Sequence, residues 1–346
     1  MEILKENMNE AEKQYWSYQF YEKAYDLIGE KIPLVIPSYN RFEKNILVNY
    51  IKTHYDFNHS WPIYICCRKS QETQYKKLIG DYGEVISFED SLIDDIGKTK
   101  EQIINYFKDY KSLFIFDDDV KVYCKTISID KNGVKKFATI EHLDFGKIMA
   151  SWQLAHEYVT KKFNCFGSCL SNEGFSFDEE TGNINKPYKL GAMMSVCVCY
   201  NLDLLRKNHL NFRTMKVSGH DDLDLTFRCL EKGLIPVYFN FMSYSAPSPQ
   251  DTITTQFGYS SNDERMIGFD NICLKNFEHL PFIVKKIHKK RKNLTPGVNW
   301  KDYIENYFIQ YNNYDLFPYN VSSNMYQDIM NNKKVEFYFQ ESLRLF

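Results

Sequence analysis

Short apolar runs alternate with segments of helical periodicity between residues 31 and 117, and this alternation constrains the fold most strongly. The apolar runs are continuous, which is typical of strands buried on both faces of a sheet. The order predicts βαβ units in a parallel sheet, whose ligands bind beyond the carboxyl ends of the strands. The predicted strands are KIPLVIP (31–37), WPIYICC (61–67), GEVISF (83–88) and SLFIFD (112–117), and the predicted helices cover 41–53, 70–80 and 98–110.

The pattern changes after residue 120, where strands and helices no longer alternate regularly. We expect a hairpin over 125–140, turning at 130–133, because Asn132-Gly133 favours a tight turn. Further expected strands cover 192–201 and 234–241, expected helices cover 8–29, 145–162, 202–207, 221–232 and 270–290, and polar loops cover 170–189 and 247–262. We therefore expect three parts, an N-terminal helix (1–30), an α/β domain (31–245) and an aromatic-rich loop and helical extension (246–346).

Composition excludes several classes of protein. The 346 residues hold 43 Lys and Arg against 45 Asp and Glu, so the net charge of −2 excludes indiscriminate coating of nucleic acid. The charged first thirty residues lack an apolar signal core, and the longest weakly polar run, about 190–202, is too short to span a bilayer. We expect a cytoplasmic protein whose nine cysteines are reduced.

Three adjacent carboxylates, Asp117, Asp118 and Asp119, follow the fourth predicted strand. They repel one another, and a bound Mg²⁺ or Mn²⁺ would remove that repulsion. Such an ion would bridge the phosphates of a nucleotide and offset charge on a leaving diphosphate. The alternative is an acidic turn that caps the next element.

Two further segments carry polar groups at predicted element ends. Pro37 to Arg41, PSYNR, follow the first strand and suit a nucleobase and ribose pocket, unless Asn40 merely caps the next helix. Asp221, Asp222 and Asp224 begin the 221–232 helix. A capping box from Ser218 would explain Asp221, and an i,i+4 pair with Arg228 would explain Asp224. Asp222 is left to accept a proton from an acceptor hydroxyl, unless all three serve the helix dipole.

Taken together, PSYNR, FDDD, GAMMSVCVCYNLDLL and GHDDLDLTFRCLEKG resemble, in this order, the GT-A glycosyltransferases of the family-two pattern, over residues 31–245. The resemblance implies a Rossmann-like, mostly parallel sheet with flanking helices. It implies a nucleotide-sugar-binding half (31–120) and an acceptor half (121–245). A nucleotide-diphosphate sugar, with a UDP-sugar the expected donor, and Mn²⁺ or Mg²⁺ would be the ligands. The family's Glu-Asp pair is Asp-Asp here, which leaves the role of the first residue in doubt.

The resemblance also implies roles for individual residues. The implied nucleotide-sugar-binding residues are Pro37, Tyr39, Arg41, Asp117 and Asp118. The implied metal ligands are Asp117 and Asp119, and the implied catalytic residues are Asp222, as base, and its neighbour Asp221.

GKTKEQIINY (97–106), leading into FIFDDDV, is similar to a segment of the TET-associated glycosyltransferases, a phage and eukaryotic group linked to sugar addition on hydroxymethylated pyrimidines in DNA. This similarity implies that Lys98 and Lys100 contact the sugar nucleotide. It also implies double-stranded DNA as acceptor, in a host cytoplasm if a phage encodes the chain. Gly97-Lys98-Thr99 is not a P-loop, because Leu92 stands where that motif needs glycine.

A basic run near the C-terminus offers a second link to nucleic acid. Its cations would track a phosphate backbone, or else form a solvated helix end. His288 within the run is a candidate late metal ligand, as in some GT-A enzymes. The cations are Lys285, Lys286, Lys289, Lys290, Arg291 and Lys292.

The cysteines are better interpreted as core residues than as metal ligands. Cys165 and Cys169 with His156 lack the four ligands of a closed zinc site, and Cys197 and Cys199 fit a buried strand.

These patterns favour a metal-dependent glycosyltransferase, an inverting one if Asp222 is the base, with hydroxymethylated DNA as the preferred acceptor. One alternative is transfer to a cell-surface polysaccharide or lipopolysaccharide. The other is an inactive GT-A domain that binds nucleic acid or protein.

Overall fold

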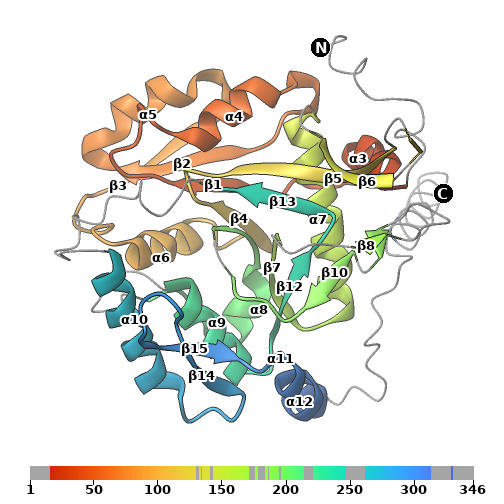
Figure 1. Ribbon diagram of the computed structural model, residues 1–346. Coiled ribbons are helices and arrows are strands. Elements are labelled where there is room, and N and C mark those ends of the chain that lie inside the picture. The colour runs from red at the N-terminus through yellow and green to blue at the C-terminus, as the bar shows by residue number, and fades with distance from the viewer. Residues whose placement is uncertain are drawn as a thin grey trace, which may run out of the picture.

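The computed structural model describes residues 16–129, 132–133, 135–140, 143–170, 176–177, 184–185, 187–194, 196–213, 221–246, 262–312 and 329. Helices flank a central eight-stranded sheet whose strand order is β10-β12-β7-β11-β4-β1-β2-β3 (Figure 1). Its strands are β1 (Leu34–Pro37), β2 (Ile63–Arg68), β3 (Glu84–Phe88), β4 (Ser112–Phe116), β7 (Cys165–Leu170), β10 (Tyr188–Leu190), β11 (Cys197–Asn201) and β12 (Ile235–Phe239).

The sheet is mixed but mostly parallel. Strands β3, β2, β1 and β4 are parallel neighbours, β11 runs antiparallel between β4 and β7, β12 is parallel to β7, and β10 is antiparallel to β12. The predicted α/β class with a mostly parallel central sheet is therefore confirmed. Since β4 and β1 are adjacent, the segments that follow their carboxyl ends, Asp117–Asp119 and Ser38–Arg41, meet at one edge.

Side chains alternate between the two faces of the sheet and enter two apolar cores. Leu34, Ile36 and Phe114 belong to one core, whereas Val35 and Ile115 belong to the other. This two-sided burial is why the strands are continuous apolar runs.

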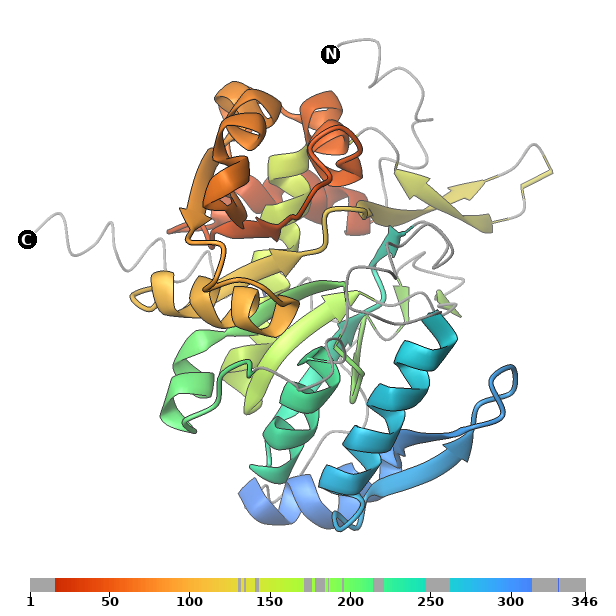
Figure 2. The same ribbon diagram turned by 90° about the vertical axis from the view of Figure 1, so that its left-hand side faces the viewer.

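The helices that cover the sheet agree broadly with prediction (Figure 2). The helix expected over 41–53 begins later, because Asn45 rather than Asn40 caps it: the Asn45 side chain accepts the Val48 amide at 2.9 Å. The helices are α3 (Trp16–Leu27), α4 (Ile46–His54), α5 (Glu72–Ile79), α6 (Ile96–Tyr106), α7 (Phe145–Lys162), α8 (Leu202–Lys207), α9 (Asp221–Glu231), α10 (Asn262–Phe277), α11 (Trp300–Asp302) and α12 (Ile309–Asn312), with a π-helical turn at Tyr303–Phe308 and 3₁₀ turns η1 (Phe57–His59), η2 (Lys69–Gln71) and η3 (Gly80–Tyr82).

The predicted hairpin is present as β5 (Lys121–Ile129) and β6 (Lys135–Ile140), and β13 (Met242–Ser245) pairs with β5 to complete a small second sheet. The expected 170–189 loop is only partly irregular, because it contains β8 (Ser176–Phe177), β9 (Ile184–Asn185) and part of β10.

The prediction of one helix over 270–290 is wrong in its second half. Helix α10 ends at Phe277, and β14 (Ile283–Ile287) and β15 (Leu294–Val298) form an antiparallel hairpin. Pro281 cannot continue a helix, and the β-branched Ile283 and Val284 favour a strand. The basic run therefore does not end a helix, and the interpretation based on a helix dipole is wrong.

A glycine in the left-handed conformation follows the segment predicted as a helix over 221–232. Gly233 has a φ of +66°, and a Cβ there would lie 2.2 Å from the Tyr311 ring. The chain thus turns and lets the C-terminal aromatic segment pack against α9. No helix in the described part of the chain is long and apolar enough to cross a membrane.

Candidate active site

The turn after β1 binds the second and third carboxylates of the acidic triplet. Arg41 Nη1 lies 2.7 Å from Asp118 Oδ1 and 2.9 Å from Asp119 Oδ2. The Ser38 hydroxyl donates to Asp118 Oδ2 at 2.5 Å, and Ser38 in turn contacts the Tyr75 hydroxyl at 2.8 Å. Both oxygens of Asp118 are therefore engaged inside the protein, which indicates that Asp118 fixes the turn.

The Arg41 guanidinium is committed to carboxylates, so it orders the acidic turn. Burial opposes the charge of Arg41, but Asp118 and Asp119 hold the pKa of Arg41 above its ordinary value. Burial likewise raises the pKa of Asp118 despite Arg41. The predicted contact of Arg41 with a nucleotide stays a prediction.

Pro37 ends β1, and Tyr39 lies in the turn that follows. The Arg68 guanidinium stacks 4.0 Å from the centre of the Tyr39 ring, and it donates to the carbonyl oxygens of Ile93 and Asp94. Pro37 is buried as the last residue of β1. The partly exposed Tyr39–Arg68 pair is thus the part of the turn that an aromatic base could meet.

Lys100 lies in a buried ion-pair cluster with the first two residues of α9. Its ammonium is 2.8 Å from Asp221 Oδ2 and 2.7 Å from Asp222 Oδ1, and only 5% of the side chain is exposed. Burial disfavours the ammonium ion, but Asp221, Asp222 and Asp117 outweigh burial and raise the pKa of Lys100. Lys100 therefore stays charged and joins α6 to the start of α9.

Asp222 carries a second contact, from a residue that sequence reasoning missed. The Tyr200 hydroxyl donates to Asp222 Oδ1 at 3.2 Å, from the neighbouring strand β11. A buried tyrosine hydroxyl needs a partner, and this signal could have directed attention to Tyr200. Among the described residues, both hydrogen bonds to the Asp222 carboxylate fall on Oδ1 and none falls on Oδ2.

Asp117 differs from its two neighbours in the triplet. Its backbone amide bonds to the Val196 carbonyl, but no described residue forms a hydrogen bond or ion pair with its carboxylate within contact distance. Burial raises the pKa of Asp117 to about 8, and Asp222, Asp119 and Asp118 add to this, whereas Lys100 opposes it. Burial, together with the charge of Asp221, also raises the pKa of Asp222, to about 6.

Asp221 and Asp222 pair with the Lys100 ammonium, and Asp117 is near enough to raise the pKa of Lys100. We call these four residues the Lys100 cluster. Asp221 is buried, whereas Asp117 and Asp222 are partly buried. When all three carboxylates are ionised, their charge exceeds that of the one cation. Their donor atoms are carboxylate oxygens, which Mg²⁺ and Mn²⁺ prefer as ligands, and a divalent cation would offset this excess.

Asp224, one turn further along α9, has a structural role. Arg213 binds it through two nitrogens at 2.5 and 2.9 Å, and Arg228 Nε donates to it at 2.9 Å. The predicted i,i+4 pair with Arg228 is therefore present. The backbone at Arg213 lies close to Gly97 in α6. A Cβ on Gly97 would lie 2.7 Å from the Arg213 carbonyl oxygen.

Lys98 does not join the Lys100 cluster. It extends from the opposite side of α6 and pairs with Asp94 at 2.7 Å in an exposed i,i+4 contact. Two residues along a helix are about 200° apart, which explains why one lysine is buried and the other is not.

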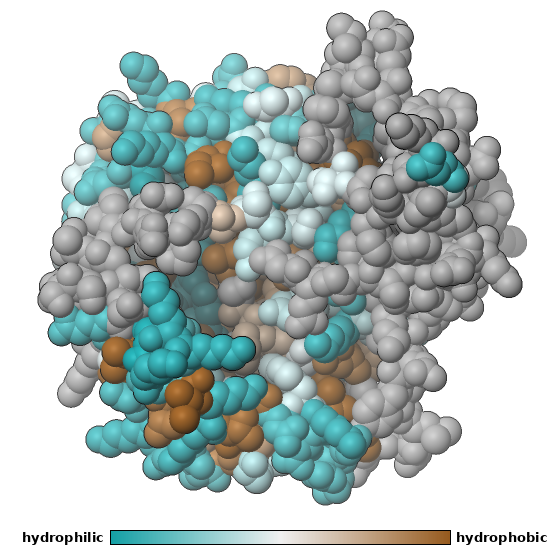
Figure 3. All heavy atoms as spheres, in the orientation of Figure 1, coloured by the Kyte–Doolittle hydropathy of each residue, from teal (hydrophilic) through white to brown (hydrophobic). Residues whose placement is uncertain are grey.

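The predicted nucleic-acid-binding residues lie on the β14–β15 hairpin. Five lysines there are exposed, but Arg291 is largely buried and pairs with Asp270 at 2.8 Å. His288 Nδ1 accepts the Arg291 amide at 3.0 Å, and among the described residues no contact joins His288 to the acidic triplet. In Figure 3 the region around the hairpin is hydrophilic with brown apolar groups among it, where Ile287 is 69% and Leu294 47% exposed.

The other cysteine and histidine candidates are core residues. His156 bonds through Nδ1 to Ser168 at 2.9 Å and through Nε2 to Ser112 at 3.3 Å, and all nine cysteines are buried and free. Ser218 and most of the polar loops expected at 170–189 and 247–262 lie outside the described residues.

No protein-family model and no curated protein match the chain. Among solved structures it is similar to S. aureus TarS 1–349, with 14% identity, 72% of this chain and 66% of that one covered, and a TM-score of 0.39. It is similar to GalNAc-T7 with UDP, GalNAc and Mn²⁺, with 10% identity, 91% and 67% coverage, and a TM-score of 0.41. It is also similar to the inositol-1-phosphate CTP transferase of T. maritima, with 11% identity, 66% of this chain and 94% of that one covered, and a TM-score of 0.32. The chain thus spans about two thirds of TarS 1–349, and these likenesses assign no activity.

Proposed function

We propose that the chain is a metal-dependent glycosyltransferase that moves a sugar from a nucleotide-diphosphate sugar to an acceptor hydroxyl. The observation that carries the proposal is the Lys100 cluster, where partly or fully buried carboxylates from the end of β4 and the start of α9 outnumber their cation. Its position beyond the carboxyl end of a parallel strand is where α/β sheets bind ligands.

Asp117 and Asp119 would hold the divalent cation, which would supply charge stabilisation to the departing diphosphate. Arg41 and Ser38 hold the turn that presents these carboxylates. The exposed edge of Tyr39, supported by Arg68, would contact the nucleobase.

Asp222 would act as the general base. Lys100 and Tyr200 both bind its Oδ1, so Oδ2 is the oxygen that would accept the proton. The acceptor oxygen would lose its proton to Asp222, form a bond to the anomeric carbon, and displace the nucleoside diphosphate in one inverting step.

Sugar transfer can be tested with a panel of radiolabelled UDP-sugars and Mn²⁺. The panel should include hydroxymethylcytosine DNA, unmodified DNA and a bacterial surface glycan as acceptors. We expect label to enter one acceptor with wild type and not with Asp117→Asn. The absence of transfer and of UDP-sugar hydrolysis by wild type, alongside DNA binding, would favour the inactive binding module.

For the acceptor we propose hydroxymethylated DNA, and the specific observation is the β14–β15 hairpin. Its exposed lysines are Lys285, Lys286, Lys289, Lys290 and Lys292. Although the whole chain carries a charge of −2, this local concentration would attract a phosphate backbone. Transfer to a surface glycan has no corresponding feature among the described residues.

The hairpin can be tested separately from catalysis. Changing Lys286, Lys289 and Lys290 to Gln should weaken binding to duplex DNA and reduce the slope of log affinity against log salt by about 3. A matched control changes three exposed lysines elsewhere, Lys77, Lys108 and Lys207, to Gln. Equal effects of both triple variants would reject the hairpin as the DNA contact.

A further inference from the structure

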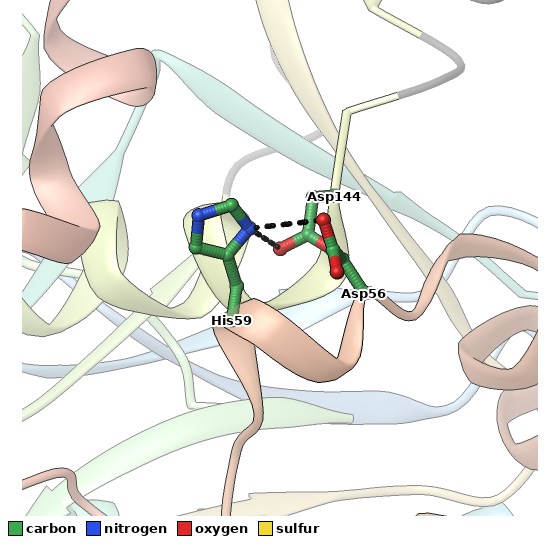
Figure 4. A group of neighbouring side chains, drawn as sticks. All are labelled: Asp56, His59 and Asp144. Carbon is green, nitrogen blue, oxygen red and sulfur yellow. Dashed lines mark ion pairs between the residues drawn. The ribbon is translucent and has the colours of Figure 1, made fainter. Parts of the chain in front are cut away.

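A second group of potential metal ligands lies outside the Lys100 cluster. Asp56 caps the 3₁₀ turn η1, His59 is the last residue of that turn, and Asp144 is the residue before α7. Their ligand atoms all lie within 4.8 Å of one another, and Figure 4 shows the three side chains converging from the two elements. Residues almost ninety positions apart thus present one nitrogen and two carboxylate oxygens to the same point.

The separations within this group are too long for hydrogen bonds. His59 Nδ1 lies 3.5 Å from Asp56 Oδ2 and 3.6 Å from Asp144 Oδ1. Tetrahedral zinc has bonds of about 2.0–2.2 Å to nitrogen and oxygen, which places neighbouring ligand atoms roughly 3.3–3.6 Å apart. The spacing therefore matches two edges of a metal coordination shell.

Two atoms of the group also lack a hydrogen-bond partner although they are buried. These are His59 Nδ1 and Asp144 Oδ2. Buried polar atoms almost always have a partner, so two such atoms within one group of side chains call for a ligand.

The surrounding contacts hold the group in place. Asp56 Oδ1 accepts the Asn58 amide at 2.9 Å, and Asp144 Oδ1 accepts the Lys147 amide at 3.1 Å, so each carboxylate also caps a helical turn. A Cβ on Gly146 would lie 2.0 Å from the His59 carbonyl oxygen, which shows how closely η1 approaches α7. The Tyr25 ring packs edge-on against the imidazole, with 4.8 Å between ring centres.

We propose that Asp56, His59 and Asp144 bind a divalent transition metal, zinc by chemistry, which fastens η1 to the start of α7. Imidazole nitrogen with two carboxylates suits zinc, cobalt or manganese, whereas calcium and magnesium prefer oxygen alone. Water would complete the tetrahedron. This site is separate from the proposed catalytic cation, which carboxylates that follow β4 would bind.

Metal binding should be measured on the full chain with Asp117→Asn and Asp119→Asn, so that the proposed catalytic ligands do not contribute. We expect Co²⁺ to give the visible absorption of a tetrahedral site, Zn²⁺ to displace it, and Zn²⁺ to raise the Tm. A crystal grown with Zn²⁺ should show an anomalous peak between the three side chains. A wild-type chain that binds neither ion at this point would overturn the proposal.

Because Asp56 and Asp144 also cap helical turns, variants can be chosen that keep the caps and remove only the metal ligands. Asparagine also caps helices, so Asp56→Asn and Asp144→Asn should preserve folding yet lower Zn²⁺ affinity, as should His59→Ala, each by roughly 100-fold or more. The matched control is His279→Ala, because His279 is an exposed histidine 3.8 Å from a single carboxylate, that of Glu231. Unchanged Zn²⁺ affinity in Asp144→Asn and His59→Ala would reduce the group to an ion-paired histidine and contradict the proposal.

Discussion

Helix α9 carries two clusters of charge within one turn, and they differ in balance. Asp224 is bound by two arginines and is only 1% exposed, so its charge is fully compensated. Asp221 and Asp222 share Lys100 with the nearby Asp117, so carboxylates exceed cations there. In the first cluster the protein's own arginines balance the carboxylate. In the second cluster a bound cation or a proton would be needed to neutralise the remaining negative charge. The two clusters on α9 therefore differ in whether cations of the protein balance their carboxylates.

The comparison predicts the largest effect at Asp222. Asp222→Asn removes the proposed base and keeps the shape and a partner for Tyr200, so kcat for sugar transfer should fall by about 10²–10⁴-fold with little change in Tm. Steady-state kinetics and thermal unfolding check this. Wild-type turnover in Asp222→Asn would place the base elsewhere.

At Asp224 we expect a loss of stability instead of a direct loss of catalysis. Asp224→Ala leaves Arg213 and Arg228 without their carboxylate, and the free energy of unfolding should fall by about 3 kcal/mol. Denaturant unfolding measures this loss, and Leu223→Ala on the same helix is a control for lost packing alone. If Asp224→Ala were as stable as wild type, the distinction between the two clusters would fail.

His156 is buried away from both charge clusters, and it should have a smaller, pH-dependent effect on the free energy of unfolding. Burial lowers the pKa of His156 to about 3, whereas an unfolded histidine titrates near 6.5. The unfolded chain then binds the proton more readily below pH 6.5, so stability is lost as the pH falls. Between pH 7 and pH 5 this residue should account for about 2 kcal/mol, and His156→Gln should make the decline shallower in unfolding curves. Parallel declines in both proteins would contradict the buried neutral imidazole.

The smallest expected effect concerns the link between Lys100 and the base. With the pKa of Asp222 raised to about 6, transfer should slow as the pH falls below 6, because a protonated carboxyl accepts no proton. Lys100→Met removes a charge that lowers this pKa, so the acidic limb of the pH–rate profile should move about one unit upward, and Lys100→Arg should restore it. An unmoved limb in Lys100→Met would show that the lysine does not act through Asp222.

Local pattern explains what could be predicted from sequence. Strands β1, β2 and β4 are continuous apolar runs and were expected within a few residues, whereas β7, CFGSCL, was missed because glycine and serine interrupt it. The 270–290 segment was misassigned because lysines at its end suit a helix as well as a hairpin.

Contacts between residues far apart in the sequence limit how much of the candidate site can be predicted. The acidic residues at 117–119 and 221–222 can be singled out from sequence, since clustered carboxylates need compensation. Which of the 43 basic residues compensates them cannot be predicted, because Lys100 is more than a hundred positions from Asp222. The Tyr200 contact and the outward orientation of Lys98 also depend on how α6 and β11 pack, which local patterns do not encode.

The most direct test of the proposed cation and nucleotide site is calorimetric titration of UDP into the protein with and without Mn²⁺. Wild type and Asp224→Asn should bind UDP tightly only when Mn²⁺ is present. The Asp117→Asn, Asp119→Asn double variant should lose the Mn²⁺-dependent binding while remaining folded. Equal UDP binding by wild type and the double variant, or binding that Mn²⁺ does not change, would contradict the assignment of these carboxylates.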